Sequence, residues 1–247
     1  VRDNGGNLVS ISEKSSESKN RVLATFGYSD LRVQTSFSGL KTVRATNGST
    51  VSVLNKVGIS DGSHYQFDYT SWGQISRITK YAPDGHALKY VSYEFPQNNR
   101  PVATASREWA EGANNQAEAV TRYSVDPNGS SAQVVLPDGS AHKEIFATQG
   151  WQRGLTIETE DSAAGAVQRR TAITWTQDDE GLPYALNPRR REVQTHFGVG
   201  NKQASRMQYG TNGLVTDVYR YSGSESVPVM HTHVEYESDA AYIARHV

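Results

Sequence analysis

The chain has 247 residues and a near-balance of charge, with 25 Lys and Arg against 26 Asp and Glu and a formal net charge of -1. This balance argues against a generic phosphate-binding surface, so nucleic acid is not expected as a partner. Cysteine is absent, which excludes disulfides, thiolate zinc sites and cysteine nucleophiles, and no apolar run approaches the roughly 18 residues that a membrane helix needs.

Strand patterns begin early and recur along the chain. Between residues 22 and 28 the side chains alternate with a period of two, which turns one face of a strand inward. The alternation recurs in residues 65–69, 172–175, 192–197 and 229–236. Asn-Gly and Asp-Gly pairs favour tight hairpins between such strands, because glycine takes positive φ without strain. These pairs lie at residues 47–48, 61–62, 84–85, 128–129, 138–139 and 212–213.

Three segments lack this pattern. Residues 12–20 are rich in Ser, Lys and Glu, which predicts an exposed strand edge or a loop. In residues 105–122, Gly112 and the pair Asn114-Asn115 interrupt any helical period, so we predict a loop between strands. Residues 178–191 predict another loop, because two prolines and a charge run oppose regular strand pairing.

The predicted fold is all-β. We expect antiparallel hairpin repeats that form one extended, strongly twisted sheet, which curls into a shell, barrel or sandwich. Residues 1–247 are interpreted as a single β domain. Because the chain starts at Val1 with neither an initiator Met nor a signal region, we expect it to be a piece of a longer protein.

One sequence pattern occurs three times. It consists of a tyrosine, three residues, a glycine, one residue, an apolar residue, two residues and a second apolar residue. The tyrosine and glycine of each copy are Tyr69 and Gly73, Tyr81 and Gly85, and Tyr209 and Gly213. Each copy predicts a strand that ends on an aromatic anchor, a turn whose glycine has positive φ, and a returning strand with apolar residues aimed at the core. Such units bury little alone and must stack on their neighbours.

The pattern resembles the YD repeat of the RHS and YD-repeat proteins of bacterial surfaces and secreted toxins, and of the related teneurins. The Asp that usually follows the repeat tyrosine is here Thr70, Ala82 and Gly210. The resemblance implies sheets that spiral into a hollow shell, often around a toxic cargo, or extracellular adhesion modules. It also draws attention to the sequence that begins at Asp126, Asp-Pro-Asn-Gly, which matches a self-cleavage motif of the toxins. Because its flanks differ from that motif, we interpret it as an ordinary turn.

A pair of histidines has the spacing of metal ligands. His231 and His233 flank Thr232, so on a strand both rings point to one face and can share a metal ion. The third ligand is either Glu235 or a residue of an adjacent strand. The alternative is an exposed polar strand face without metal.

Aromatic and acidic residues suggest two further kinds of site. Trp72, Trp109 and Trp151 are candidate platforms for a glycan, because an indole offers a flat apolar face to a sugar, although the same rings can fill a β-core. Glycoside hydrolysis needs two carboxylates across a sugar. The acidic candidates are Glu158, Glu160, Asp161 and the cluster Asp178-Asp179-Glu180. Their spacing does not single out a pair, and charged strand faces and solvated loops explain most such residues, so no catalytic residue is assigned.

The basic run Arg189-Arg190-Arg191 is interpreted as loop charge paired with the acids at residues 178–180.

The function predicted is non-enzymatic: a structural or adhesive β-repeat segment of a bacterial secreted or cell-surface protein, which encloses cargo or presents a binding surface. Its expected partners are a cargo domain or neighbouring repeats of the same parent chain, and no cofactor is expected. The alternative is a carbohydrate-binding or carbohydrate-active β domain.

Overall fold

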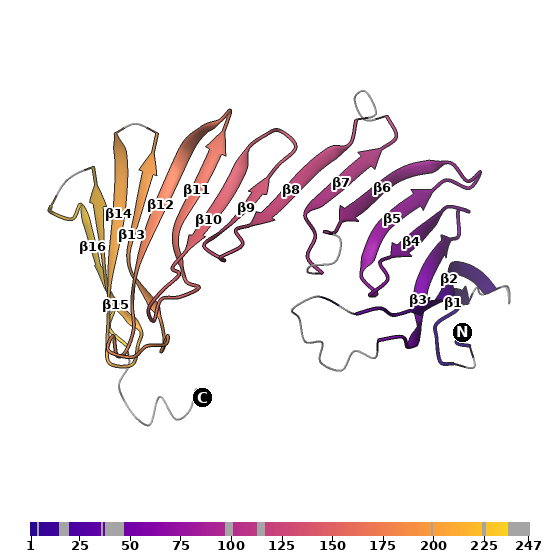
Figure 1. Ribbon diagram of the computed structural model, residues 1–247, viewed down its shortest axis with the longest axis horizontal. Coiled ribbons are helices and arrows are strands. Elements are labelled where there is room, and N and C mark those ends of the chain that lie inside the picture. The colour runs from indigo at the N-terminus through magenta and orange to yellow at the C-terminus, as the bar shows by residue number, and fades with distance from the viewer. Residues whose placement is uncertain are drawn as a thin grey trace. The chain divides into compact units, whose positions relative to one another are not determined.

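The computed structural model describes residues 1–3, 5–14, 20–35, 37, 47–96, 101–112, 117–198, 200–223 and 226–236. These residues form strands, antiparallel to their chain neighbours from β1 to β8 and from β9 to β16, and no helix (Figure 1). The strands are β1 (Ser10–Lys14), β2 (Asn20–Arg32), β3 (Thr50–Ile59), β4 (His64–Tyr69), β5 (Ile75–Tyr81), β6 (Ala87–Glu94), β7 (Ala105–Ala110), β8 (Ala119–Val125), β9 (Ser131–Val135), β10 (Ala141–Phe146), β11 (Thr156–Ala163), β12 (Ala166–Thr176), β13 (Arg189–Phe197), β14 (Asn201–Tyr209), β15 (Val215–Ser222) and β16 (Met230–His233). The prediction of an all-β fold made of antiparallel hairpins is confirmed.

The chain divides into two compact units, Val1–Tyr123 and Ser124–Val247. The first unit holds β1 to β7 and most of β8, and the second holds β9 to β16. In both units the strands are hydrogen-bonded in chain order. Within the described part of each unit the first and last strands do not pair with each other, so the sheet of each unit is open.

The core is thin. Most contacts between strands are made by strands that are neighbours in a sheet, not by strands packed face to face. The buried side chains of the described residues are Ser63, Thr79, Ala82, Ala105, Ser106 and Gln177. Large apolar side chains are at best half-buried, so stability depends on strand pairing and on cross-strand contacts of about 0.2 to 1 kcal/mol each rather than on a deep core.

One five-residue turn recurs at five hairpins. Its first residue donates its N–H to the carbonyl of the fifth, and the glycine in fourth place donates back to the first, at 2.8 to 3.1 Å. The turn spans residues 59–63, 70–74, 82–86, 136–140 and 210–214. Its glycines, which include Gly73, Gly85 and Gly213, have φ between 77° and 92°. In four copies an Asp or Asn in third place accepts the N–H of the fifth residue. These turns confirm the hairpins predicted from four of the Asp-Gly and Asn-Gly pairs.

The three copies of the sequence repeat share a second feature beyond the turn. After Tyr69, Tyr81 and Tyr209 the returning strand carries one extra residue opposite the tyrosine. The extra residues are Ser76, Leu88 and Thr216. Such a bulge bends its strand and increases the local twist. The same bulge occurs opposite Tyr28, Phe146 and Trp175, which lie outside the repeat pattern.

Aromatic side chains lie at the ends of five ladders of strand pairing and hydrogen-bond just beyond them. We call them the aromatic anchors: Tyr28 donates to the carbonyl of Leu8, Tyr69 to Leu54, Trp175 to Thr156, Tyr209 to Arg190 and Tyr236 to Val215, at 2.6 to 3.1 Å. Each acceptor lies on the preceding strand or its extension, two residues before the outermost paired residue, as Arg190 precedes Glu192. A carbonyl beyond the ladder has no strand partner, so the anchor satisfies it. Tyr81 differs, because its ring stacks on His64 with centroids 4.9 Å apart.

Two of the predicted loops are partly wrong. Residues 105–122 form a hairpin in which β7 and β8 flank Gly112, whose φ of 77° marks a turn. β7 begins with the buried small residues Ala105 and Ser106. Because such residues give no clear apolar alternation, the strand was not predicted from the sequence. The loop predicted over residues 178–191 ends where β13 begins, so the arginine run lies in a strand. Residues 15–19 lie outside the described residues. The interpretation of Asp126 as the start of a turn is confirmed, since it accepts the N–H of Gly129 at 2.8 Å.

Candidate functional site

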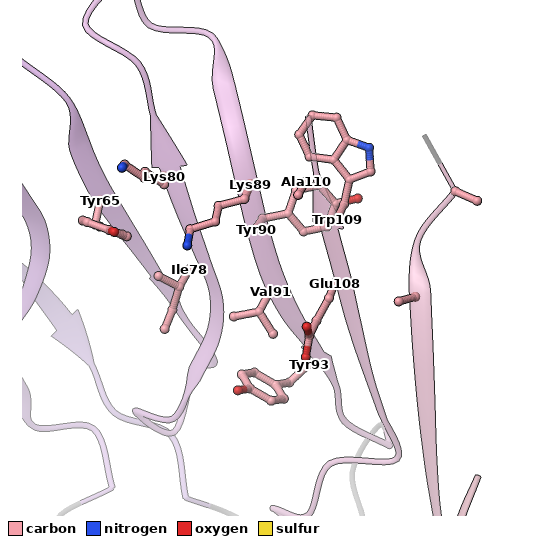
Figure 2. Close-up of a pocket in the computed structure, with 12 residues that line it drawn as sticks. Tyr65, Ile78, Lys80, Lys89, Tyr90, Val91, Tyr93, Glu108, Trp109 and Ala110 are labelled. Atoms are coloured by element: carbon pink, nitrogen blue, oxygen red, sulfur yellow. The ribbon is translucent and has the colours of Figure 1, made fainter. Parts of the chain in front are cut away.

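A groove with a volume of about 590 Å³ crosses β4 to β8 on one face of the first unit (Figure 2). Tyr65 faces Lys80, and Lys80 faces Lys89, so these three side chains share that face. Val91 and Tyr93 follow Lys89 at intervals of two along β6 and continue the same face. The groove therefore combines two ammonium groups and the carboxylate of Glu108 with aromatic and aliphatic walls.

The two lysines of the groove form a like-charge pair. Lys80 and Lys89 occupy directly opposite positions of β5 and β6, an arrangement that costs stability unless an anion lies nearby. The Lys80 ammonium lies 5.8 Å from the centroid of the Tyr65 ring. Hydrogen bonds from Ser63 lower the pKa of Asp61, and the charge of Lys80 lowers it further. Among the described residues neither lysine forms an ion pair. Sequence reasoning missed both, because only the register brings them together.

Trp109 and Tyr90 also line the groove, but their side chains alternate away from the lysines, because Trp109 faces Tyr90, the residue next to Lys89. The two rings stack with centroids 5.6 Å apart, and the guanidinium of Arg77 lies 3.8 Å from the Tyr90 centroid. The Tyr90 hydroxyl donates to Glu118, and this hydrogen bond raises the pKa of Tyr90. Trp109 thus packs on Tyr90, which in turn contacts Arg77 and Glu118.

The other two candidate tryptophans lie elsewhere. Trp72 packs edge-to-face against Phe37 and Phe95, each with centroids 5.5 Å apart, and its Nε1 donates to Gln74 at 2.8 Å. Trp151 is half-buried in a turn of the second unit. Within the first unit, Trp72 and Trp109 therefore have separate aromatic surroundings.

The candidate carboxylates are paired with bases. Glu160 binds Arg170 at 2.5 Å, and Glu158 lies 3.4 Å from the same guanidinium. Asp161 binds His142 and Arg169, each at 2.6 Å, and the hydrogen bond from His142 contributes most to lowering the pKa of Asp161. Carboxylates held by arginines on a strand face are suited to charge pairing, not to proton transfer to a sugar.

In the acidic cluster of residues 178–180, Asp178 is also bound to neighbouring side chains. Asp178 accepts a hydrogen bond from Asn187 at 2.7 Å and forms an ion pair with Arg189. These two contacts, that of Asn187 first, lower the pKa of Asp178. The predicted pairing of the arginine run with this cluster is confirmed for Arg189, whose guanidinium also lies 5.3 Å from the ring centroid of Tyr209.

His231 and His233 meet Asp217 on one face of the β15–β16 hairpin. Asp217 directly faces His233, and His231 precedes His233 by two residues. Asp217 Oδ1 lies 2.8 Å from His231 Nε2 and 2.8 Å from His233 Nδ1. Hydrogen bonds from His233 and His231 lower the pKa of Asp217 to about 2, and Asp217 raises the pKa of His233. Of the two third ligands considered from sequence, the residue of the adjacent strand is the one that converges.

Other histidines near carboxylates do not converge in this way. His86 contacts Asp84 through Nδ1 and Glu111 through Nε2, so the two carboxylates lie on opposite sides of the ring. His142 has a single imidazole beside Asp161, whose other oxygen binds Arg169. Within the described residues, Asp217, His231 and His233 are the group whose ligand atoms all lie within 4.8 Å of one another.

Comparisons with known proteins give distant structural similarities. No family model matches the sequence, and no curated protein matches it. The chain is similar to a chain in the crystal structure of TcdB2-TccC3-Cdc42, with a TM-score of 0.43 and 13% identity over 91% of this chain and 13% of that chain. It is also similar to a porin-like protein from Bacteroides uniformis, with a TM-score of 0.32 and 9% identity over 91% of this chain and 89% of the other.

A third similarity is to a chain of the Tc holotoxin pore of Photorhabdus luminescens, with a TM-score of 0.23 and 12% identity over 92% of this chain and 14% of that chain. The chain thus spans about one seventh of the length of the toxin-complex chains. TM-scores below 0.5 do not define a shared fold. Among the described residues no helix is long and apolar enough to span a membrane.

Proposed function

We propose that residues 1–247 are a non-enzymatic structural segment of a longer β-repeat protein, secreted or on a bacterial surface. The observation that carries the proposal is the recurrence of one unit: a five-residue turn and a bulge opposite an aromatic residue at strand ends in both halves of the chain. Repetition of one geometry builds an extended wall. A catalytic site requires unlike groups that converge at one place, whereas the candidate acids Glu160, Asp161 and Asp178 are paired with arginines.

The thin core and the strand edges support this role. β1 and β16 each have one strand partner within the described residues, and an edge strand exposes N–H and C=O groups that favour pairing with a further strand. We infer that adjoining repeats of the parent chain supply those strands, and that a wall so extended encloses a cargo domain or presents a binding surface. The resemblance of the repeats at Tyr69, Tyr81 and Tyr209 to YD repeats agrees with this role.

Hydrogen exchange tests the proposal. The chain is produced alone and together with the flanking sequence of its gene, and amide exchange is compared strand by strand. Amides of β1 and β16 are expected to exchange at least about tenfold more slowly in the longer protein, because new strands cover them. Amides of β13, which already has two strand partners, serve as the control and should be unchanged. Equal exchange at β1 and β16 in both proteins would refute the proposal.

The lysine pair of the groove favours one second candidate, binding of an acidic glycan on the wall. A carboxylate or sulfate between Lys80 and Lys89 relieves their repulsion, and the rings of Tyr65 and Tyr93 offer apolar faces to sugar carbons. This candidate moves the platform from the tryptophans to the tyrosine-lined face that Figure 2 shows.

Calorimetry with acidic and neutral oligosaccharides tests this candidate. Lys89→Ala is expected to weaken binding of an acidic oligosaccharide at least about tenfold, the loss of one charge-assisted contact. Lys143→Ala, which removes a lysine from β10, is the matched control and should leave binding unchanged. Equal affinity for neutral and acidic sugars, or equal loss in both variants, would count against the groove.

A further inference from the structure

The donor atoms of Asp217, His231 and His233 have the spacing of a metal site. In a tetrahedral zinc centre, bonds of about 2.0 to 2.1 Å place the donor atoms about 3.4 Å apart. Asp217 Oδ1 now lies 2.8 Å from each of the two histidine nitrogens. An ion that replaces these two hydrogen bonds therefore requires each histidine nitrogen to move only about 0.6 Å away from Asp217 Oδ1, and all three donor atoms already lie within 4.8 Å of one another.

Two neighbours of the trio lie beside its rings. His231 stacks on Tyr219, with centroids 4.3 Å apart and an angle of 7° between the planes. Glu235 Oε1 lies 3.6 Å from His233 Nε2, which is the ring nitrogen that faces away from Asp217. A carboxylate on the far nitrogen of a ligating histidine orients the ring and strengthens the ligand. Glu235 would take the outer position by moving closer to His233 Nε2, whereas Asp217 already lies in the inner one.

We propose that Asp217 Oδ1, His231 Nε2 and His233 Nδ1 bind one divalent cation of the Zn²⁺, Ni²⁺ or Cu²⁺ class. Imidazole ligands suit these ions, whereas Mg²⁺ and Ca²⁺ prefer sites made of oxygen atoms. Three protein ligands leave at least one position for water. The proposal rests on the β15–β16 hairpin alone and does not depend on the structural role of the chain.

The site joins two strands. Asp217 belongs to β15, and both histidines belong to β16, a strand of four exposed residues with one partner within the described residues. An ion bound to both strands favours the paired state of the hairpin, because it binds that state and not the frayed one. The metal therefore stabilises the pairing of β16 with β15.

Titration calorimetry on the untagged, chelator-treated chain tests the site. One Zn²⁺ per chain is expected to bind with micromolar or tighter affinity, while Mg²⁺ gives no heat. His233→Gln and Asp217→Asn should each weaken Zn²⁺ binding about 10- to 100-fold. In the wild type, Zn²⁺ should also slow amide exchange in β16, which a site elsewhere on the chain would not do.

His142→Gln is the matched control, since His142 also binds a carboxylate across a strand pair but lacks a second imidazole. It should bind Zn²⁺ like the wild type. His233 is half exposed, so its variant is expected to fold, and circular dichroism verifies this. Absence of Zn²⁺ binding at micromolar concentration, or Zn²⁺ affinity unchanged in His233→Gln, would overturn the proposal.

Discussion

Replacing Trp175 with alanine is expected to lower the free energy of unfolding of the chain by about 3 kcal/mol, as for other large-to-small aromatic substitutions. Trp175 anchors the end of β12 through its Nε1 hydrogen bond to the carbonyl of Thr156 at 2.8 Å. Its ring also packs near the guanidinium of Arg190, 5.8 Å from the ring centroid. The substitution removes this packing and leaves the carbonyl without its donor. Urea denaturation followed by circular dichroism measures the change.

Two further variants separate packing from hydrogen bonding. Trp175→Phe keeps most of the apolar surface but loses the N–H donor, so we expect a loss of about 1 kcal/mol. Trp151→Phe is the matched control, because Trp151 lies in a turn and is not an anchor, and it should change stability by less than about 0.5 kcal/mol. If Trp175→Phe and Trp151→Phe prove equally mild, the anchor hydrogen bond does not stabilise the sheet.

Local chemistry made the turns predictable. Asn212-Gly213 and Asp84-Gly85 carry both requirements of the turn within a few residues, a side-chain acceptor and a residue that tolerates positive φ. The alternation of β4 was equally local. In β7 and the arginine run the pattern was hidden, since small or charged residues occupy a strand whose partners, not its composition, keep it extended.

The anchors were only partly predictable because their acceptors lie on another strand. The tyrosine spacing included Tyr69 and Tyr209, which are anchors, but also Tyr81, which stacks on a histidine instead. It omitted Trp175 and Tyr236, whose acceptor carbonyls lie about twenty residues upstream. The register of the sheet determines which carbonyl needs a donor, and that register is not visible in a spacing pattern.

The same reason explains what the sequence revealed about the candidate sites. The spacing of His231 and His233 predicts a shared strand face, because two residues apart on a strand is a local relation. Asp217 precedes His231 by 14 residues, and only the pairing of β15 with β16 makes it the third donor. The facing of Lys80 and Lys89 likewise follows from the turn between them, which shifts the register by one residue through its bulge.

Gly213→Ala is expected to lower the free energy of unfolding by about 2 kcal/mol, the second largest effect among these variants. At φ of 77° an alanine Cβ costs about 1 to 2 kcal/mol. The added Cβ would also lie 2.8 Å from Arg189 Nη1, so the guanidinium must move. That movement disturbs the ion pair with Asp178 and the contact with the Tyr209 ring. Thermal or urea unfolding measures the loss.

Gly85→Ala isolates the backbone contribution, because Gly85 holds the same place in the same turn, at φ of 91°, with nothing within 4 Å of the added Cβ. Its expected cost is about 1 kcal/mol. The excess at Gly213 should disappear when Gly213→Ala is made in an Arg189→Ala background, since the displaced group is then absent. If the excess persists there, the arginine is not its cause, and if both glycines prove neutral, the recurring turn does not depend on a left-handed glycine.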